Sequence, residues 1–273
     1  MKADEVRQAL HGKQCTFVRV ADVPAGIGTE LSCPSTAGEI RIIGNLSSLQ
    51  AAFDRTQEVV AQAKGIPVSG YSLDGLETLA AAERVTLRAV LEALRAAGLE
   101  SIGEAPFDLL QNARRSIEEV NIAGLALARL TVHQLSTSNV SVLFKQVADL
   151  QRGVAVVRAF APLPRTQNSA LPTTGYDDIR RVALARLIVE NVASIQVDWS
   201  LYGPKLAQVA LTVGADDLDA VSPAEATGEG WRRAPLEEVR RNIRAAGQEP
   251  VERNGRFELI EHHTHAGSHI PAE

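Results

Sequence analysis

Apolar and polar positions along this chain follow two periods that alternate from one end to the other. Short, almost continuous apolar runs are typical of buried parallel strands, and most of them are followed by a run with helical spacing. The clearest helical run places Leu87, Val90, Leu91 and Leu94 on one face and stops before Gly98. The segments predicted as strands are 16–20, 39–44, 67–73, 100–102, 130–135, 154–160, 194–197 and 217–221.

Residues 194–221 show the repeating unit most clearly. An apolar run at 195–197 is followed by a helical run from 204 to 213, and Gly214 stands where a helix C-terminus favours glycine. A second strand with acidic residues follows at once, which implies two parallel strands joined by a helix. Eight such strands predict an α/β protein with a (β/α)8 TIM-type barrel. We expect one domain over residues 1–260 and a His-rich tail over residues 261–273.

The first strand–helix unit departs from this rhythm. Between residues 20 and 39 there is no helical periodicity, and Pro24, Gly26, Gly28 and Pro34 favour a loop. The sequence therefore predicts a barrel whose first βα unit lacks its helix. We expect a partner subunit or the chain's own tail to cover the opening, so an oligomer is one alternative.

Composition and charge exclude several classes of protein. The formal net charge is −5 and the basic residues are dispersed, so a nucleic-acid partner is not expected. No apolar run approaches the roughly 18 residues of a membrane span, and the N-terminus has no signal-peptide core. Two cysteines do not form a disulfide framework, which favours a reducing compartment. We expect a cytoplasmic protein.

Several motifs occur in a fixed order. Residues 199–211 contain a Trp and then G-x-K-x-A-Q-x-A-L, and residues 214–219 read G-A-x-D-x-D. Residues 246–253 read AGQEPVER, and shorter similarities occur at 11–18 and 160–175. The chain resembles the radical S-adenosylmethionine enzymes of the futalosine route to menaquinone, which include aminofutalosine synthase and cyclic dehypoxanthine futalosine synthase. The resemblance covers roughly residues 10–255.

The defining motif of that family is absent. Members follow the first strand with C-x-x-x-C-x-x-C, whose thiolates hold a [4Fe–4S] cluster that binds S-adenosylmethionine. The equivalent stretch here contains only Cys33, and Cys15 lies earlier, inside the strand. Two such cysteines cannot supply three thiolates on one loop. We therefore expect no iron–sulfur cluster and no bound metal, and S-adenosylmethionine binding is doubtful.

The candidate ligand-binding residues follow from the barrel, because its active sites lie at the carboxyl ends of the strands. The candidates are Asn45, Glu104, Ser136, Asn139, Trp199, Asp217 and Asp219. Asp217 and Asp219 share one strand face and could hold a ribose diol or a cation, or one could cap a turn while the other is solvated. Trp199 could stack on a purine or pack in the core. His133 lies in an apolar strand pattern and is interpreted as a core histidine.

Two sequence features argue against the family's own ligand contacts. The family has a G-G-G-A-E loop after the fourth strand, whereas this chain has Gly103-Glu104-Ala105-Pro106. It also continues the acidic run with Gly-Thr, whereas Ala220-Val221 follows here. Glycines allow backbone amides to approach a ligand closely, so contacts of that kind are not expected on the altered loop.

The C-terminal tail carries four histidines, at positions 262, 263, 265 and 269. Imidazole is a ligand for zinc, copper and nickel, but no accompanying carboxylate–histidine motif is present. The tail is either solvated or partner-facing, or it folds back over the barrel mouth, where its histidines would lie beside Asp217 and Asp219 as a mixed nitrogen and oxygen metal site.

Two functions remain open. In the first, the chain is a non-radical homologue that binds a nucleoside-like ligand or a partner subunit in menaquinone synthesis. In the second, it is a non-radical, metal-assisted enzyme that acts on a futalosine-type nucleoside or a small acid through Asp217, Asp219 and the tail histidines. Fold alone does not decide between them.

Overall fold

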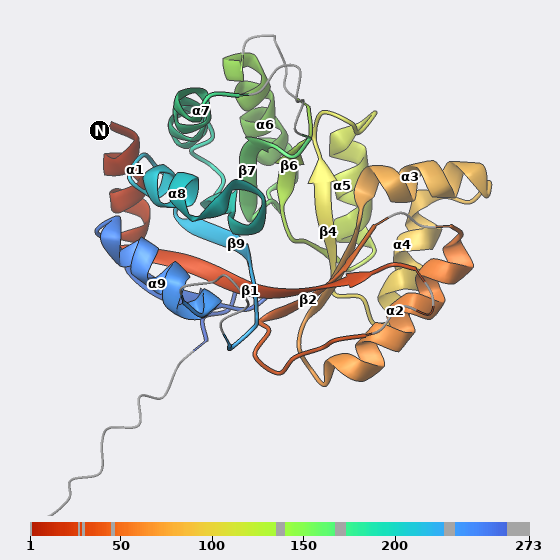
Figure 1. Cartoon of the computed structure of the whole chain (residues 1–273). Coiled ribbons are helices and arrows are strands. Elements are labelled where there is room, and N and C mark those ends of the chain that lie inside the picture. Colours follow the sequence, from red (N-terminus) through yellow and green to blue (C-terminus); the bar gives the residue numbers. More distant parts are fainter. Residues whose placement is uncertain are drawn as a thin grey trace, which may run out of the picture.

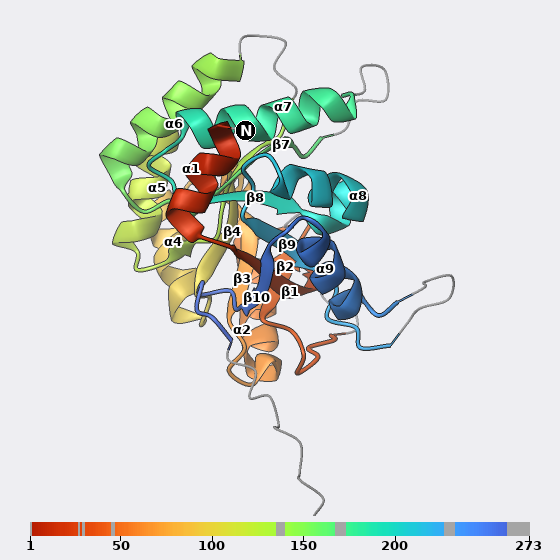
Figure 2. The same cartoon turned by 90° about the vertical axis from the view of Figure 1, so that its left-hand side faces the viewer.

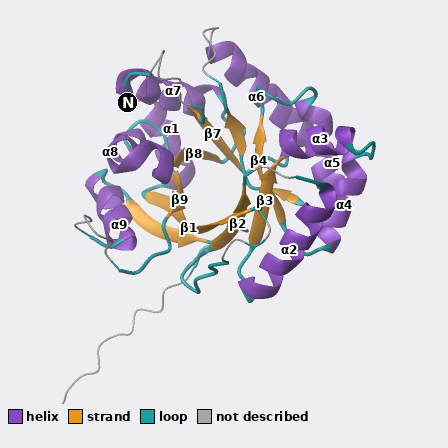
Figure 3. Cartoon of the chain, turned by 45° about the vertical axis from the view of Figure 1, so that its right-hand side comes forward, coloured by secondary structure: helices purple, strands orange, loops and turns teal. Residues whose placement is uncertain are grey.

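The computed structural model describes residues 2–26, 28, 31–44, 47–134, 140–166, 173–226 and 233–260. These residues form a closed barrel of parallel strands with helices on the outside (Figures 1 and 3). The barrel strands are β1 (Gln14–Pro24), β2 (Glu39–Ile43), β3 (Val68–Ser72), β4 (Ser101–Pro106), β6 (Leu130–Val132), β7 (Ala159–Pro164), β8 (Ser194–Asp198) and β9 (Asp217–Val221). Each strand pairs with the next, and β9 pairs with β1 to close the ring, which confirms the predicted (β/α)8 fold.

The helices lie between successive strands and cover the barrel with their apolar faces. They are α2 (Leu49–Ala63), α3 (Leu73–Ala82), α4 (Leu87–Ala96), α5 (Ala113–Ile122), α6 (Val140–Val154), α7 (Gly175–Ile188), α8 (Trp199–Leu211) and α9 (Pro235–Ala245). A further helix, α1 (Lys2–His11), precedes β1, and the short strand β5 (Ala126–Leu127) pairs with β4. None of the helices in the described part of the chain is long and apolar enough to cross a membrane.

One predicted strand is displaced along the chain. The sequence suggested a strand at 154–160, but α6 extends to Val154 and β7 begins only at Ala159. A short apolar run does not distinguish the buried end of a helix from a strand, so the periodicity was ambiguous there. Ala155, with a φ of 54°, ends the helix.

The first βα unit has no helix among its described residues, as predicted. The chain's own C-terminal segment covers the lower part of this side, at the amino-terminal end of β1. Strand β10 (Glu249–Arg253) pairs in parallel with Gln14–Val18 of β1, below the part of β1 that pairs with β2 (Figure 2). The segment then continues past β2, where the Gly255 amide donates to the Gly38 carbonyl, and reaches β4, where Arg256 pairs with Glu100. The His-rich tail after residue 260 lies outside the described residues.

The barrel interior contains an unusually large number of charged side chains. Apolar layers usually fill such a barrel, but here Asp217 and Asp219 of β9 point inward and are at most 1% exposed. Asp217 accepts two hydrogen bonds of 2.7 Å from Arg253, and Asp219 accepts two from Arg41. The sequence predicted both aspartates on one face of a strand at 217–221, as ligand-binding residues. They do lie within β9. Guanidiniums from β2 and β10 already bind them and offset the cost of burying them.

Candidate functional site

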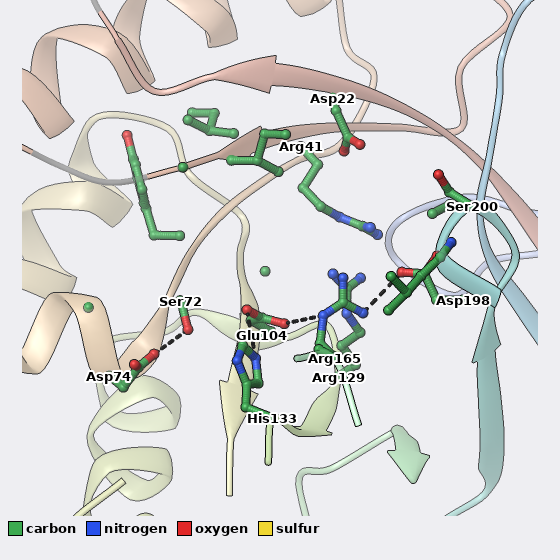
Figure 4. A pocket seen from close by; sticks show the side chains of 18 of the residues that line it. Asp22, Arg41, Ser72, Asp74, Glu104, Arg129, His133, Arg165, Asp198 and Ser200 are labelled. Atoms are coloured by element: carbon green, nitrogen blue, oxygen red, sulfur yellow. Dashed lines mark hydrogen bonds and ion pairs between the residues drawn. The ribbon is translucent and has the colours of Figure 1, made fainter. Parts of the chain in front are cut away.

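The carboxyl ends of the strands surround a cavity of about 980 Å³. Figure 4 shows side chains from several strands converging on it. Its charged and polar lining comprises Asp22, Arg41, Ser72, Asp74, Thr78, Glu104, Arg129, His133, Arg165, Asp198 and Ser200. This is the end of the barrel where the sequence predicted a ligand site, and its size falls within the range of small-molecule pockets.

The floor of the pocket is one carboxylate held between two guanidiniums. Asp219 accepts from both terminal nitrogens of Arg41, at 3.0 and 2.8 Å, and from Arg129 Nη1 at 2.6 Å. Burial would raise the pKa of Asp219, but Arg129 and Arg41 outweigh it and hold that pKa well below its usual value. Burial, together with the neighbouring Arg41, lowers the pKa of Arg129. Its Nε has no hydrogen-bond partner among the described residues, although the side chain is only 4% exposed.

One wall is a chain of alternating charges. Arg165 Nη1 donates to Asp198 at 3.0 Å, and Arg165 Nε lies 3.1 Å from Glu104 Oε2. His133 Nε2 lies 3.2 Å from Glu104 Oε1. Burial opposes ionisation of Glu104, but His133 and the nearby arginines, Arg129 and Arg165, lower its pKa to about 2. Glu104 is therefore ionised throughout the physiological range, with Arg165 and His133 on either side of it.

The opposite wall carries a carboxylate of a different kind. Asp22, at the end of β1, points into the pocket (Figure 4) and makes no hydrogen bond or ion pair with any described residue. The Asp22 side chain is exposed to the pocket. The surrounding protein still partly desolvates it, and this desolvation, reinforced by the negative charges of Asp219 and Asp198, raises its pKa against the attraction of Arg41 and Arg129. Asp22 is thus the pocket carboxylate whose oxygens are open to a ligand.

The backbone of the pocket is strained at two positions. Tyr71 has a φ of 66° and Ala220 a φ of 56°, and both line the cavity. Left-handed backbone at residues other than glycine costs energy and concentrates at functional sites. The Tyr71 hydroxyl is hydrogen-bonded to Thr56 and to the Ala52 carbonyl of α2, which fixes the position of the ring. Ile43 and Leu79 give one side an apolar surface.

The predicted site residues fall into three groups. Glu104 lines the pocket, and Asp219 lies directly beneath it. Asp217 lies deeper in the barrel, bonded to Arg253, and Trp199 packs in the hydrophobic core. Asn45, Ser136 and Asn139 lie outside the described residues.

The interpretation of His133 as a core histidine is wrong, because its side chain is 21% exposed and lines the pocket. The sequence also gave no prediction for Asp22, Arg41, Arg129 and Arg165. A signal was present for Arg41 and Arg129, since each is a charged residue inside an apolar strand pattern. In a barrel such a residue faces the interior.

A [4Fe–4S] cluster requires several thiolates, and the residues after β1 do not fit it. The 273 residues contain two cysteines, and only Cys33 lies on the loop after β1. Cys15 is fully buried within β1, and burial raises its pKa, which disfavours the thiolate. No group of three or more histidine, cysteine or carboxylate side chains in the described residues is placed to hold a metal.

The fold and the pocket define a (β/α)8 barrel with a polar site at the carboxyl ends of its strands. Residues 160–266 match the family described as the CofH/MqnC C-terminal region. Aminodeoxyfutalosine synthase of Thermus thermophilus is 26% identical over 230 residues, which cover 72% of this chain and 61% of that protein. Cyclic dehypoxanthine futalosine synthase of Streptomyces coelicolor is 26% identical over 210 residues, covering 68% of this chain and 53% of that protein.

Solved structures agree on the fold. Methylornithine synthase superposes with a TM-score of 0.63 at 10% identity, covering 91% of this chain and 87% of that one. The [FeFe]-hydrogenase maturase HydG gives a TM-score of 0.62 at 11% identity, covering 91% and 66%. The chain is related to the radical S-adenosylmethionine enzymes of the futalosine pathway, which confirms the family its motifs suggested. It spans between half and two thirds of the length of these curated relatives.

Proposed function

We propose that this chain is a non-radical relative of the futalosine-pathway enzymes that binds a small nucleoside-like molecule at the mouth of its barrel. The observation that carries the proposal is the contrast between two adjacent features. The loop after β1 has a single cysteine, whereas the pocket beside that loop keeps a dense polar lining. The chain lacks the thiolates that a [4Fe–4S] cluster requires, but it has a polar pocket of a size suited to a small molecule.

The arrangement of the pocket favours binding of a polar molecule with an apolar part. Charged groups from β1, β2, β4 and the segments after β6 and β7 converge at one end, and Ile43 and Leu79 lie at another. A nucleoside has this character, because its sugar is polar and its base has apolar faces. The relatives named for futalosine compounds make a ligand of this class the reasonable first probe.

A partner subunit of the menaquinone pathway remains part of the proposal. The chain's own segment 249–260 covers the lower part of the side that lacks a helix, next to β1 and Gly38. The upper part, beside the pocket, is bordered by the loop between β1 and β2. A subunit bound there would sit at the entrance to the pocket.

The first test separates a non-radical protein from a radical one. The protein is purified without oxygen, treated with iron and sulfide, and analysed for iron and acid-labile sulfide. We expect neither at stoichiometric level, and no binding of S-adenosylmethionine by calorimetry. Stoichiometric iron and sulfide, with S-adenosylmethionine binding, would refute the proposal.

The second test concerns the pocket. Gly75 of α3 lines it, and a Cβ built there meets no atom within 4 Å. Gly75→Trp should therefore fill part of the pocket, with Gly75→Ala as its matched control. We expect adenosine, inosine or a related nucleoside to bind the native protein and the Ala variant but not the Trp variant. Binding that is absent, or equal in all three proteins, would contradict the proposal.

One observation favours a second candidate, an enzyme without a radical step. His133 lies 3.2 Å from a carboxylate oxygen of Glu104, and an imidazole held by a carboxylate is a common general base. Asp217 and Asp219 do not suit that role, because guanidiniums already bind their oxygens. Conversion of a bound nucleoside, followed by mass spectrometry and lost in His133→Gln with affinity retained, would support this candidate.

A further inference from the structure

We infer that Asp22 is the ligand-anchoring carboxylate of the pocket, and that it selects an uncharged or cationic ligand with adjacent O–H or N–H donors over a phosphorylated one. The inference rests on the proposed function, since it requires that a small molecule binds in this pocket. It deepens that function by naming the residue that holds the ligand and the class of ligand it accepts.

The first step compares the acidic side chains of the pocket. Asp219 is bonded by two guanidiniums and Asp198 by Arg165 and the Leu201 amide, and the Ser72 hydroxyl donates to Asp74. Glu104 lies within ion-pair distance of Arg165 and His133. Asp22 has no such partner among the described residues. A carboxylate has about four acceptor positions, so Asp22 can accept two donors from a ligand.

The second step identifies what else in the pocket lacks a partner. Arg129 is 4% exposed, lines the cavity, and its Nε makes no hydrogen bond to any described residue. A buried N–H without a hydrogen-bond partner costs free energy. A ligand acceptor that binds this N–H would remove the cost. Glu104 Oε2 and His133 Nε2 also lack a hydrogen bond among the described residues, but they lie within ion-pair distance of Arg165 and of Glu104. The pocket therefore presents an acceptor with no charged neighbour in contact, Asp22, and an open donor, Arg129. A molecule with donors at one point and a carbonyl or ring nitrogen at another satisfies both.

The third step concerns net charge. The described lining carries four carboxylates, from Asp22, Asp74, Glu104 and Asp198, and three guanidiniums, from Arg41, Arg129 and Arg165.

Two further carboxylates, Glu39 and Asp219, bond directly to Arg41. The guanidiniums are thus more than compensated by carboxylates of the chain itself. A phosphate would meet an excess of negative charge, and Asp22 would lie among the nearest groups to repel it. An uncharged sugar diol or an amine meets no such repulsion.

The test measures binding of adenosine, 2′-deoxyadenosine, adenosine monophosphate and agmatine by calorimetry. The native protein is compared with Asp22→Asn and with Asp54→Asn, the same change at an exposed aspartate of α2 that does not line the pocket. Loss of hydrogen bonds to a charged acceptor costs about 1.5–3 kcal/mol, which corresponds to about 10- to 150-fold in affinity. We expect this loss for adenosine in Asp22→Asn and less than about 2-fold in Asp54→Asn.

The ligands identify the donor. If a diol binds Asp22, 2′-deoxyadenosine binds about 10-fold more weakly than adenosine to the native protein and equally to Asp22→Asn. If an amine binds there, agmatine shows the Asp22-dependent affinity instead. In both cases adenosine monophosphate binds more weakly than adenosine, and the difference shrinks in Asp22→Asn.

Failure of the inference is distinguishable from failure of the proposed function. Binding that Gly75→Trp abolishes but Asp22→Asn leaves unchanged would overturn the role of Asp22 while the pocket stands as the site. Tighter binding of the monophosphate than of adenosine would overturn the selection against anions. Absence of any binding sensitive to Gly75→Trp would overturn both. Thermal unfolding of each variant shows that a loss of affinity is not a loss of fold.

Discussion

Replacement of Asp219 by asparagine tests whether the charged interior holds the barrel together. The carboxylate is buried and accepts three hydrogen bonds, at 2.6, 2.8 and 3.0 Å, from Arg129 and Arg41. Asparagine has nearly the same shape, but its charge is zero and its amide nitrogen cannot accept from a guanidinium. The change leaves two buried positive charges without their shared counterion.

The expected cost follows from the burial. Removing one partner of a buried ion pair costs about 3–5 kcal/mol, against a total stability of about 5–15 kcal/mol for a domain. In a protein of this size that lowers the melting temperature by about 6–20 °C. Urea unfolding followed by circular dichroism measures the free energy. The control is Asp54→Asn, an exposed aspartate of α2 that accepts a hydrogen bond from Gln50, for which we expect a change within about 0.5 kcal/mol.

Acidification gives an independent check on the same residue. The pKa of Asp219 is held below its ordinary value in the folded state, so its stabilisation is complete above the unfolded pKa of about 4. It is lost as the pH falls further toward the folded value. The native protein should therefore lose more stability than Asp219→Asn as the pH decreases below about 4. A cost under about 1 kcal/mol at neutral pH, with parallel acid curves, would show that Arg41 and Arg129 do not depend on this carboxylate.

Four further outcomes are expected. Gly214→Ala should destabilise the protein by about 1–3 kcal/mol in urea unfolding, because φ is 122° there and a Cβ would lie 2.9 Å from a side-chain carbon of α7. Gly75→Ala, within α3, should leave stability unchanged or raise it by up to about 1 kcal/mol. Nucleoside affinity should fall on acidification at a pH above the ordinary aspartate range, because the raised pKa of Asp22 causes it to gain its proton early. Arg165→Gln should raise the pKa of Glu104 above its present value of about 2, as carboxyl NMR titration would show.

The fold was predictable because each strand and helix shows its own period. The unit from β8 through α8 to β9 follows the predicted order, and Gly214 lies in the turn after α8 with the positive φ that glycine favours. Segment 154–160 was misplaced because its apolar residues continue from the end of α6 into β7 with almost no break in the pattern. An apolar residue indicates burial, but it does not show whether the backbone at that position is a helix or a strand.

The site was predictable in place but not in composition. Strand order placed it at the carboxyl ends of the strands, and Glu104 is there. Arg41, Arg129 and Arg165 could not be assigned, because pairing between distant strands decides which charges are compensated. Asp219 meets Arg129 across 90 positions and Arg41 across 178, and no local pattern encodes those contacts. Asp217 and Asp219 were predicted to bind a ligand because the local sequence does not show that Arg253 and Arg41 already bind them.

Carboxylates that are paired within the chain and the carboxylate that is not paired should respond differently to substitution, the first in stability and the second in ligand binding. Asp219 and Asp217 are bonded on all sides by side chains of this chain, so changing them should alter stability first. Asp22 has no such partners in the described structure, so changing it should alter binding and leave stability nearly intact. A variant set in which affinity and melting temperature fall together for all three residues would contradict this division. It would mean that the charged residues of the pocket stabilise the fold together with the buried ion pairs, and that Asp22 does not bind a ligand.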